Sequence, residues 1–278
     1  MISEYSVLMP LWSGEKLCFL EQSLKSMINQ TFPPHEYVFV IDQPISNEMD
    51  SLIKTLIKFH SSIHYVKAYH LSGLGLGALL KVGVEACTCS FVARMDSDDI
   101  SLPDRCEKEL KILNSSSSIA VVGSFLTEFD TSPDMPISIR KVPENGAEFN
   151  QFAKLRNPIN HPTVMFRKSL ILEVGNYNAF FSHCEDYELW YRIIKYGYLS
   201  YNIQESLLLF RTGKDFLERR SHTKNLKSYI KLKKIMRKDK FINLNEYLLS
   251  ILIQYFFSNA PLKIKEIIYQ QLRTKCND

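Results

Sequence analysis

With 278 residues, of which 45% are hydrophobic and 12% aromatic, the chain can form one large domain and is too apolar to be disordered. No stretch approaches the ~20 uninterrupted apolar residues of a spanning helix, and Pro10 and Gly14 interrupt any early run of signal-peptide type. We therefore expect a cytoplasmic protein whose six cysteines are reduced thiols, and whose net charge of +4 is concentrated near its C-terminus.

The first part of the chain alternates β-branched apolar runs with segments that carry apolar residues at helical spacing. Pro10 is expected to end the first strand, and Gly73, Gly75 and Gly77 to loosen the loop before the third helix. Because strand and helix alternate in units of about thirty residues or fewer, the pattern predicts an α/β fold with a mostly parallel sheet flanked by helices. The expected elements are strands at 5–9, 37–42, 63–69, 91–95 and 119–123, and helices at 15–30, 46–59, 77–87 and from Pro103.

The alternation breaks at residues 130–160, which are rich in Pro, Asn and Ser. Beyond this stretch we expect a short strand at 163–167, a helix at 184–197, a strand-like segment at 198–211 and a basic helical region from about 220. The predicted organisation is a domain of residues 1–215, with halves of about 1–125 and 126–215, followed by a C-terminal helical appendage at 216–278.

The segment FVARMDSDD at residues 91–99 reads as a buried strand that delivers Asp96, Asp98 and Asp99 into a loop. Carboxylates this close repel one another unless a divalent cation lies among them. Hard cations held by one or two carboxylates usually also bind phosphates. The segment therefore indicates a metal site for a phosphorylated or nucleotide-linked substrate, and the alternative is a solvated acidic turn that caps the next helix.

Ligands of parallel α/β sheets bind outside the carboxyl ends of the strands. This rule places the loops after residues 9, 42, 69 and 95 at one edge of the predicted sheet. Asp42, the glycine loop and the DSDD cluster are then expected to converge, which weakens the interpretation as a solvated turn.

These segments, taken together and in this order, resemble the family 2 glycosyltransferases, which have the Rossmann-like GT-A fold. The resemblance spans roughly residues 5–212, and FVARMDSDDISLPDR is similar to the metal-binding DxD segment of the family. Further similar segments are the opening strand–helix–strand at 7–42, HPTVMFRK at 161–168, and GNYN with EDYELWYR at 175–178 and 185–192. The resemblance implies transfer of a sugar from a nucleotide diphosphate donor, most often a UDP-sugar, with Mn²⁺ or Mg²⁺ as cofactor and inversion at the anomeric carbon.

The resemblance also implies donor-site roles. Asp98 would bind the metal, Asp96 would face the ribose or the water shell of the metal, and Asp99 would reach the hydroxyls of the donor sugar. Asp42 would bind the base or ribose, or alternatively cap a helix; Arg94 would either meet the pyrophosphate or pair with the acids. The other implied donor-site residues are Pro10, Leu11, Trp12, Glu15, Gly75, Ser97 and Arg211.

An acceptor hydroxyl is a weak nucleophile until a general base removes its proton. The resemblance implies that Asp186 is this base and that Glu185 orients donor or acceptor, whereas an isolated acidic pair at a helix start would simply cap the helix. His161 is either an acceptor or phosphate contact or a structural histidine. Trp190 either lines the acceptor pocket or belongs to the core.

Residues 219–240 hold ten Lys/Arg and one acid, a net +9 that leaves −5 for the rest of a chain of total charge +4. The lysines at 224, 227, 231, 234 and 238 recur at helical spacing, and a second apolar helix follows them. We expect either contact with an anionic membrane surface at the inner face of the plasma membrane or a merely solvated face. No motif supports binding to nucleic acid.

The family resemblance implies a lipid-linked or oligosaccharide acceptor, as in the biosynthesis of O-antigen or capsule, which fits a peripheral location at the membrane. The competing readings are a metal-dependent phosphatase or nucleotidyltransferase, and a non-catalytic carbohydrate-binding module. A phosphatase of the aspartyl-phosphate type would carry its acids after the first strand, and here they follow the fourth.

Overall fold

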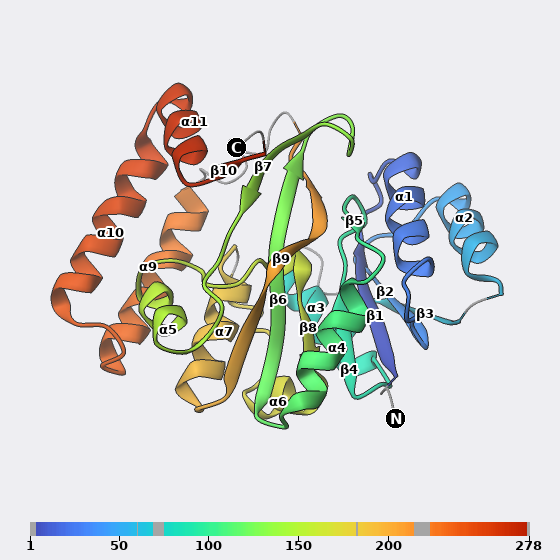
Figure 1. The fold of residues 1–278 in the computed structure, drawn as a ribbon, viewed down its shortest axis with the longest axis horizontal. Coiled ribbons are helices and arrows are strands. Elements are labelled where there is room, and N and C mark those ends of the chain that lie inside the picture. Colours follow the sequence, from blue (N-terminus) through green and yellow to red (C-terminus); the bar gives the residue numbers. More distant parts are fainter. Residues whose placement is uncertain (1–3, 60, 69–74, 182, 214–222, 277–278) are drawn as a thin grey trace.

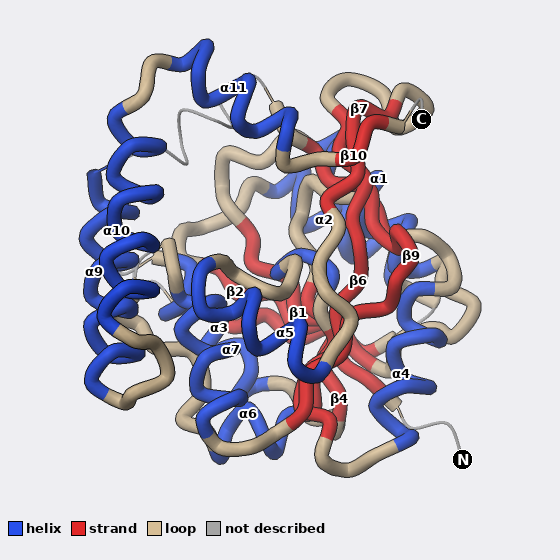
Figure 2. Tube along the Cα trace, turned by 60° about the vertical axis from the view of Figure 1, so that its left-hand side comes forward, coloured by secondary structure: helices blue, strands red, loops and turns tan. Residues whose placement is uncertain are grey.

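A single curled sheet with helices on both faces organises the computed structural model, which describes residues 4–59, 61–68, 75–181, 183–213 and 223–276 (Figure 1). Within these residues the strand order is β10-β7-β6-β8-β4-β1-β2-β3, and β9 pairs with β6 and β5. Figure 2 shows the strands as a twisted central layer between helices. The α/β architecture expected from the sequence is confirmed. Gly73 and Tyr69 lie outside the described residues.

The N-terminal half of the sheet is parallel, as predicted. β1 pairs with both β2 and β4, and β2 pairs with β3, all in parallel register. The elements of this half are β1 (Tyr5–Leu11), α1 (Leu17–Ile28), β2 (Glu36–Ile41), α2 (Asn47–Ile57), β3 (Ser62–Lys67), α3 (Leu76–Ala86), β4 (Phe91–Arg94), β5 (Ile100–Ser101) and α4 (Arg105–Ser115).

Beyond β4 the sheet is mixed. β8 lies antiparallel between β4 and β6, and β7 is antiparallel to β6, whereas β6 and β9 are parallel. The stretch at 130–160, where the alternation was expected to break, nevertheless contains a strand and a helix. The elements are β6 (Ile119–Phe129), β7 (Pro136–Arg140), α5 (Gly146–Leu155), the 3-10 turn η2 (His161–Thr163), β8 (Met165–Arg167), α6 (Lys168–Glu173), α7 (Glu185–Lys195) and β9 (Leu199–Arg211).

The first strand does not end at Pro10 as predicted but continues to Leu11. The carbonyl of Leu8 accepts from the backbone N–H of Met95, so the backbone of Leu8 and of Pro10, two residues on, faces the side of β4. The register of β4 with β1 ends at Leu8, and beyond it no β4 ladder remains on that side. Because Pro10 has no β4 residue opposite it, its missing N–H costs no hydrogen bond between strands. Pairing with β2 extends β1 through Pro10 to Leu11.

Alternate residues of β1 supply two cores. Val7 and Met9 face a core that contains α1, α2 and α4, whereas Leu8 faces a second core made with α3, α5, α6 and α7. Helix α3 lies especially close to the sheet at Gly83, where a Cβ atom would come within 2.3 Å of Leu8 and 2.5 Å of Val40. The absence of a side chain at this position lets the backbone of α3 approach β1 and β2.

Three C-terminal helices form the appendage, α9 (Thr223–Lys238), α10 (Leu244–Asn259) and α11 (Leu262–Gln271), followed by β10 (Thr274–Lys275) on the edge of β7. They gather at the side of the molecule opposite to α1 and α2 (Figure 1). A third core cluster joins Leu232 and Met236 of α9 to Tyr187 and Tyr191 of α7. Residues 219–222 of the basic segment lie outside the described residues, as does the side chain of Lys224.

Replacing Gly83 with valine is expected to destabilise the protein by about 1–3 kcal/mol, because the added atoms overpack the contact between α3 and the sheet. Lys81→Val, at an exposed position of the same helix, is the matched control and introduces the same side chain without a clash. Urea unfolding measures both variants, and equal midpoints would show that the close approach at Gly83 does not hold.

Candidate active site

The DSDD turn begins where β4 ends and is anchored on β1, α1 and the loop between them. The backbone carbonyl of Asp96 accepts from the Ser23 hydroxyl at 2.7 Å, and the Ser97 hydroxyl donates to Glu15 at 2.7 Å. The guanidinium of Arg94 forms an ion pair with Asp96. Glu15 and Ser97, both predicted to lie at the donor site, are thus brought together with Asp96.

Negative charge accumulates at this turn. Burial, with the nearby Asp96 and Glu15 carboxylates, raises the pKa of Asp98 to about 7. No group of three or more His, Cys, Asp and Glu that could hold a metal ion occurs among the described residues. Asp96 and Asp98 remain the two carboxylates that the sequence predicts for a metal, and Mg²⁺ is commonly held by one or two carboxylates together with substrate phosphates.

Asp99 lies beneath the turn rather than at its surface. Its side chain is 0% exposed, and its Oδ1 accepts from the backbone N–H of Arg211 at 2.9 Å. Burial, with Asp98 and Asp96 nearby, raises the pKa of Asp99 well above its usual range. This carboxyl attaches β9 to the turn through Oδ1, while its Oδ2 has no hydrogen-bond partner among the described residues, so its contact with sugar hydroxyls stays a prediction.

The side chain of Arg211 is also engaged within the protein. Its Nε donates to the carbonyl of Asp98 at 2.9 Å and its Nη2 to Gln22 at 2.6 Å, while the guanidinium stacks on Phe19 and Phe129. In the structure Arg211 holds β9 against the DSDD turn, and its expected place at the donor site stays a prediction.

The loops after β1 and β2 lie next to each other because these strands are paired. Trp12 is 64% exposed, and its ring covers Gly14, where a Cβ would lie 2.5 Å from the indole. Leu11, by contrast, packs in the core, which corrects its assignment to the nucleotide site. Pro10 is only partly exposed beside it.

Asp42 follows the last residue of β2, and its Oδ1 is buried with no hydrogen-bond partner among the described residues. The alternative role as a helix cap is not observed, because Ser46 caps α2 by accepting from the backbone N–H of Met49. An unpartnered carboxylate oxygen at the carboxyl edge is available to a ligand hydroxyl or amine.

The acidic pair Glu185 and Asp186 opens α7, and α3 brings it to the same edge. Gly75 begins α3 with a φ of 86°, which favours glycine. Two residues later, a Cβ at Gly77 would lie 2.9 Å from that of Glu185. The first turn of α3 and the start of α7 are therefore in contact. Burial together with the Asp186 carboxylate raises the pKa of Glu185 to about 7.

Asp186 keeps access to solvent and has a dedicated hydrogen-bond donor. Its side chain is 16% exposed, its Oδ1 accepts from the backbone N–H of Tyr187, and its Oδ2 accepts from the Asn157 amide at 2.6 Å. Burial raises the pKa of Asp186, and these two donors oppose the rise. Sequence analysis did not identify Asn157, because it lies in the stretch at 130–160 where no element was expected.

His161 and Trp190 form the wall behind Asp186. His161 Nδ1 lies 4.0 Å from Asp186, and its Nε2 shares a hydrogen bond of 2.9 Å with the hydroxyl of Tyr177. Burial, with the charge of Arg94, lowers the pKa of His161 well below its usual range, so the ring is neutral. Trp190 is 0% exposed and packs edge-on against His161, which favours the core alternative over the acceptor pocket.

Arg94 connects the two acidic groups electrostatically. Burial raises the pKa of the carboxyls, and the positive charge of Arg94 opposes that rise at Asp98 and Asp99 of the turn and at Glu185 and Asp186 of α7. The Arg94 side chain is 4% exposed, and its Nε and Nη1 have no hydrogen-bond partner among the described residues. The charge of one guanidinium therefore acts on carboxylates of both the DSDD turn and α7.

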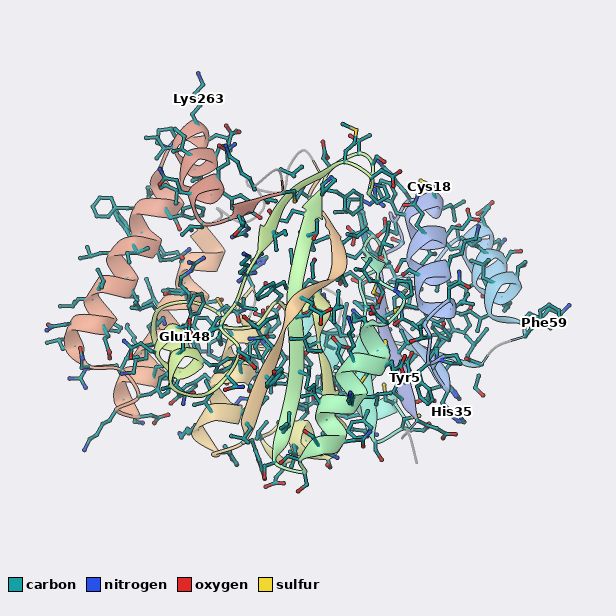
Figure 3. The ribbon with its side chains drawn as sticks, viewed as in Figure 1. Tyr5, Cys18, His35, Phe59, Glu148 and Lys263 are labelled. Atoms are coloured by element: carbon teal, nitrogen blue, oxygen red, sulfur yellow. The ribbon has the colours of Figure 1, made fainter. Side chains whose placement is uncertain are left out.

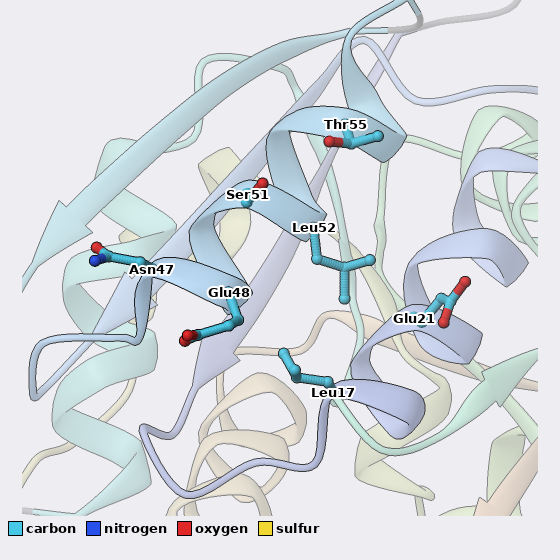
Figure 4. A pocket seen from close by; sticks show the side chains of 7 residues that line it. All are labelled: Leu17, Glu21, Asn47, Glu48, Ser51, Leu52 and Thr55. Atoms are coloured by element: carbon cyan, nitrogen blue, oxygen red, sulfur yellow. The ribbon is translucent and has the colours of Figure 1, made fainter.

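A separate groove runs between α1 and α2, and none of its lining residues belongs to the DSDD turn or to the acidic start of α7 (Figure 4). Two of its side chains, Glu21 and Glu48, are acidic, which disfavours a phosphate there. We therefore place the site at the carboxyl edge of the sheet. The groove is lined by Leu17, Glu21, Asn47, Glu48, Ser51, Leu52 and Thr55.

Comparison with known proteins agrees with this geometry. The family model described as Glycosyl transferase family 2 matches residues 6–172. The amylovoran biosynthesis glycosyltransferase AmsE of Erwinia amylovora is 33% identical over 97% of this chain and 99% of its own length. The UDP-Gal:alpha-D-GlcNAc-diphosphoundecaprenol beta-1,3-galactosyltransferase of Escherichia coli is 29% identical over 97% of this chain and 96% of its own.

A solved structure with the same fold is the mannosyltransferase PcManGT from Pyrobaculum calidifontis, in complex with GDP-Man and Mn²⁺. It superposes with a TM-score of 0.62 and 11% identity over 98% of this chain and 80% of that chain. At this identity the likeness establishes the fold alone, which is GT-A, as the sequence predicts.

Replacing Asn157 with alanine is expected to raise the pKa of the Asp186 carboxyl, because the amide stabilises its charged form. Asp186 would then remain protonated to higher pH than in the unmodified protein. Carbon NMR of labelled aspartate side chains over a pH series measures the shift, with Asn150→Ala on the exposed face of α5 as control. An unchanged titration of Asp186 in Asn157→Ala would contradict the assigned hydrogen bond.

Proposed function

The chain belongs to glycosyl transferase family 2, and on this basis we propose that it transfers a sugar from a UDP-linked donor to a hydroxyl of a lipid-linked glycan during synthesis of a surface polysaccharide. The observation that carries the proposal is that one buried guanidinium, Arg94, pairs with Asp96 of the DSDD turn and also opposes the rise in pKa of Glu185 and Asp186 at the start of α7. A nucleotide diphosphate and an acceptor hydroxyl would lie on opposite sides of one sugar ring in such a site.

Asp186 is suited to be the base. Its carboxylate keeps solvent access, is held by the Asn157 amide, and lies 4.0 Å from a neutral His161 that does not compete for its charge. Asp186 takes the proton of the acceptor hydroxyl, whose oxygen attacks the anomeric carbon from the face opposite the diphosphate. The bond from that carbon to the phosphate oxygen breaks, its electron pair leaves with the nucleotide diphosphate, and the configuration inverts.

The leaving diphosphate requires positive charge. Asp96 and Asp98 would hold Mn²⁺ or Mg²⁺, which as a Lewis acid stabilises the charge that develops on the departing phosphate. Burial, followed by repulsion from Asp96 and Glu15, raises the pKa of Asp98 to about 7, and a bound cation would relieve that repulsion. The unpartnered Nε and Nη1 of Arg94 provide two further donors between the turn and the base.

Donor and acceptor class are supported by a relative. The galactosyltransferase of Escherichia coli is named for a UDP-sugar donor and an acceptor linked to diphosphoundecaprenol. The unpartnered carboxylate of Asp42 supplies an acceptor for ribose or base at the same edge. A phosphatase or nucleotidyltransferase would have no use for a second carboxylate pair beside a neutral histidine, and we do not favour either.

Asp186→Asn is expected to lower turnover by about three orders of magnitude or more, because an amide cannot take the proton of the acceptor hydroxyl in the transition state. Binding of UDP should survive, because Asn157 can still hydrogen-bond the amide that replaces the carboxylate. Release of UDP from a panel of UDP-sugars with a lipid-pyrophosphate acceptor gives the rate, and Glu148→Gln on the exposed surface of α5 is the control. Turnover near normal would exclude Asp186 as the base.

Asp98→Asn is expected to abolish the part of UDP affinity that depends on Mn²⁺, because the substitution removes a charged oxygen ligand. Calorimetry with UDP, with and without Mn²⁺, measures the difference, and the exposed Asp134→Asn should behave as the unmodified protein. If the unmodified protein binds UDP equally with and without metal, the proposed cofactor is wrong. If it binds no UDP at all, a non-catalytic carbohydrate module is favoured instead.

A further inference from the structure

Helix α10 is apolar around most of its circumference, yet it lies at the outside of the molecule. Figure 3 shows its side chains projecting away from the body along one edge, and only Ser250 of this helix is fully buried. Phe256 is 67% exposed and Ile253 56%. The exposed apolar residues of α10 are Leu244, Leu248, Leu249, Leu252, Ile253, Tyr255 and Phe256.

The apolar surface continues onto α11, where Leu262, Ile264 and Ile267 are exposed. Exposed apolar residues scattered singly need no explanation, but ten of them gathered on two consecutive helices mark an interaction site. The N-terminus of α10 is well defined, because Asn243 and Glu246 form a reciprocal capping box there. The helix is therefore a folded element that presents this surface, which we call the α10–α11 face.

The charges around the face indicate what covers it. The exposed lysines Lys227, Lys231, Lys234 and Lys238 belong to α9, the helix that packs beside α10, and Lys263 projects from α11 (Figure 3). The only acid of α10, Glu246, is paired with Lys154. An apolar surface that lies beside a lysine-bearing helix, and whose only exposed acid on α11 is Glu266, is complementary to an anionic lipid surface.

A second copy of the chain fits this surface less well. In a two-fold dimer the same patch contacts itself, so the α9 lysines of both copies would be brought together. A transmembrane segment does not fit either, because no helix in the described part of the chain is long and apolar enough to cross a membrane. The remaining occupant is the boundary between lipid headgroups and acyl chains.

We propose that the α10–α11 face inserts into the headgroup–acyl boundary of an anionic bilayer, with the α9 lysines against the lipid headgroups. This inference rests on the proposed function, since a lipid-linked acceptor would be presented at that boundary. The sequence predicts that the lysine stripe, with the apolar helix that follows it, contacts an anionic membrane surface. The structure adds the apolar surface and makes it the main source of binding energy.

The appendage is attached directly to the helix that carries the base. Lys233 of α9 is buried, and its Nζ donates at 2.6 Å both to the carbonyl of Lys154 and to the hydroxyl of Tyr187. Tyr187 follows Asp186 on α7 and in turn donates to the carbonyl of Ala153. A bilayer bound at the α10–α11 face would thus be held in a fixed position relative to the first turn of α7, which carries Glu185 and Asp186.

The test is flotation of the full chain with vesicles of phosphatidylcholine, with and without phosphatidylglycerol, in the absence of donor and acceptor. A variant with Leu249→Ser, Ile253→Ser and Phe256→Ser should lose about tenfold or more in vesicle partitioning, because each side chain contributes apolar area to insertion. Phe59→Ser, at an exposed phenylalanine on the opposite side of the molecule, is the matched control (Figure 3). Partitioning of the triple variant equal to that of the unmodified protein overturns the proposal.

A second variant tests the charged border. Lys227→Gln with Lys234→Gln and Lys238→Gln should weaken binding to the phosphatidylglycerol vesicles by about tenfold or more and leave weak binding to pure phosphatidylcholine unchanged. Equal binding to both vesicle types by the unmodified protein overturns the role of anionic lipid. A dimer in sedimentation that the serine variant converts to a monomer, with vesicle binding unchanged, would identify a second copy as the occupant and overturn the proposal.

These outcomes are separable from failure of the proposed function. Vesicle binding is measured without any sugar, so an inactive protein that still requires the α10–α11 face to bind vesicles would refute the reaction and leave this inference standing. If the reaction holds, the serine variant should retain its rate on a short, water-soluble acceptor and lose rate on the acceptor carried in vesicles.

Discussion

The buried guanidinium of Arg94 is the interaction on which the candidate site depends. Carboxylates from β4 and from α7 gather at one edge of the sheet, and burial makes each of them harder to ionise. The positive charge of Arg94 opposes this rise in pKa for both groups of carboxylates. Arg105 fixes the backbone around Arg94 by donating to the carbonyls of Arg94 and Pro162 at 3.2 Å. Without a cation at this position, the pKa values of the acids in the turn and in α7 would rise further.

The sheet explains how residues so distant in sequence meet. Its parallel half places the ends of β1, β2 and β4 at one edge, as in any open α/β sheet. The mixed half then returns to that edge, because β9 runs parallel to β6 and pairs at its far end with β5, directly after the DSDD turn. Arg211, at the end of β9, closes this connection on Asp98 and Asp99.

The C-terminal helices extend the same framework outward. Their contacts with α7 run through Tyr187, Tyr191 and the buried Lys233, so the appendage is packed onto the helix whose first turn carries Glu185 and Asp186. Its outer surface is apolar where a water-exposed helix is normally polar. An enzyme of this family that acts on lipid-linked sugars would need both properties, a fixed base and a surface compatible with lipid.

The sequence by itself determined the α/β class, the order of most elements, and the two acidic segments, because hydrophobic periodicity and closely spaced carboxylates are local signals. It could not show that Asn157 donates to Asp186, since that amide lies in a stretch without periodicity. Nor could it show that Leu11, Asp99 and Trp190 are buried. Burial and hydrogen-bond partners depend on what other strands and helices bring to a residue, so only the tertiary structure decided which residues near the site face a ligand and which hold it together.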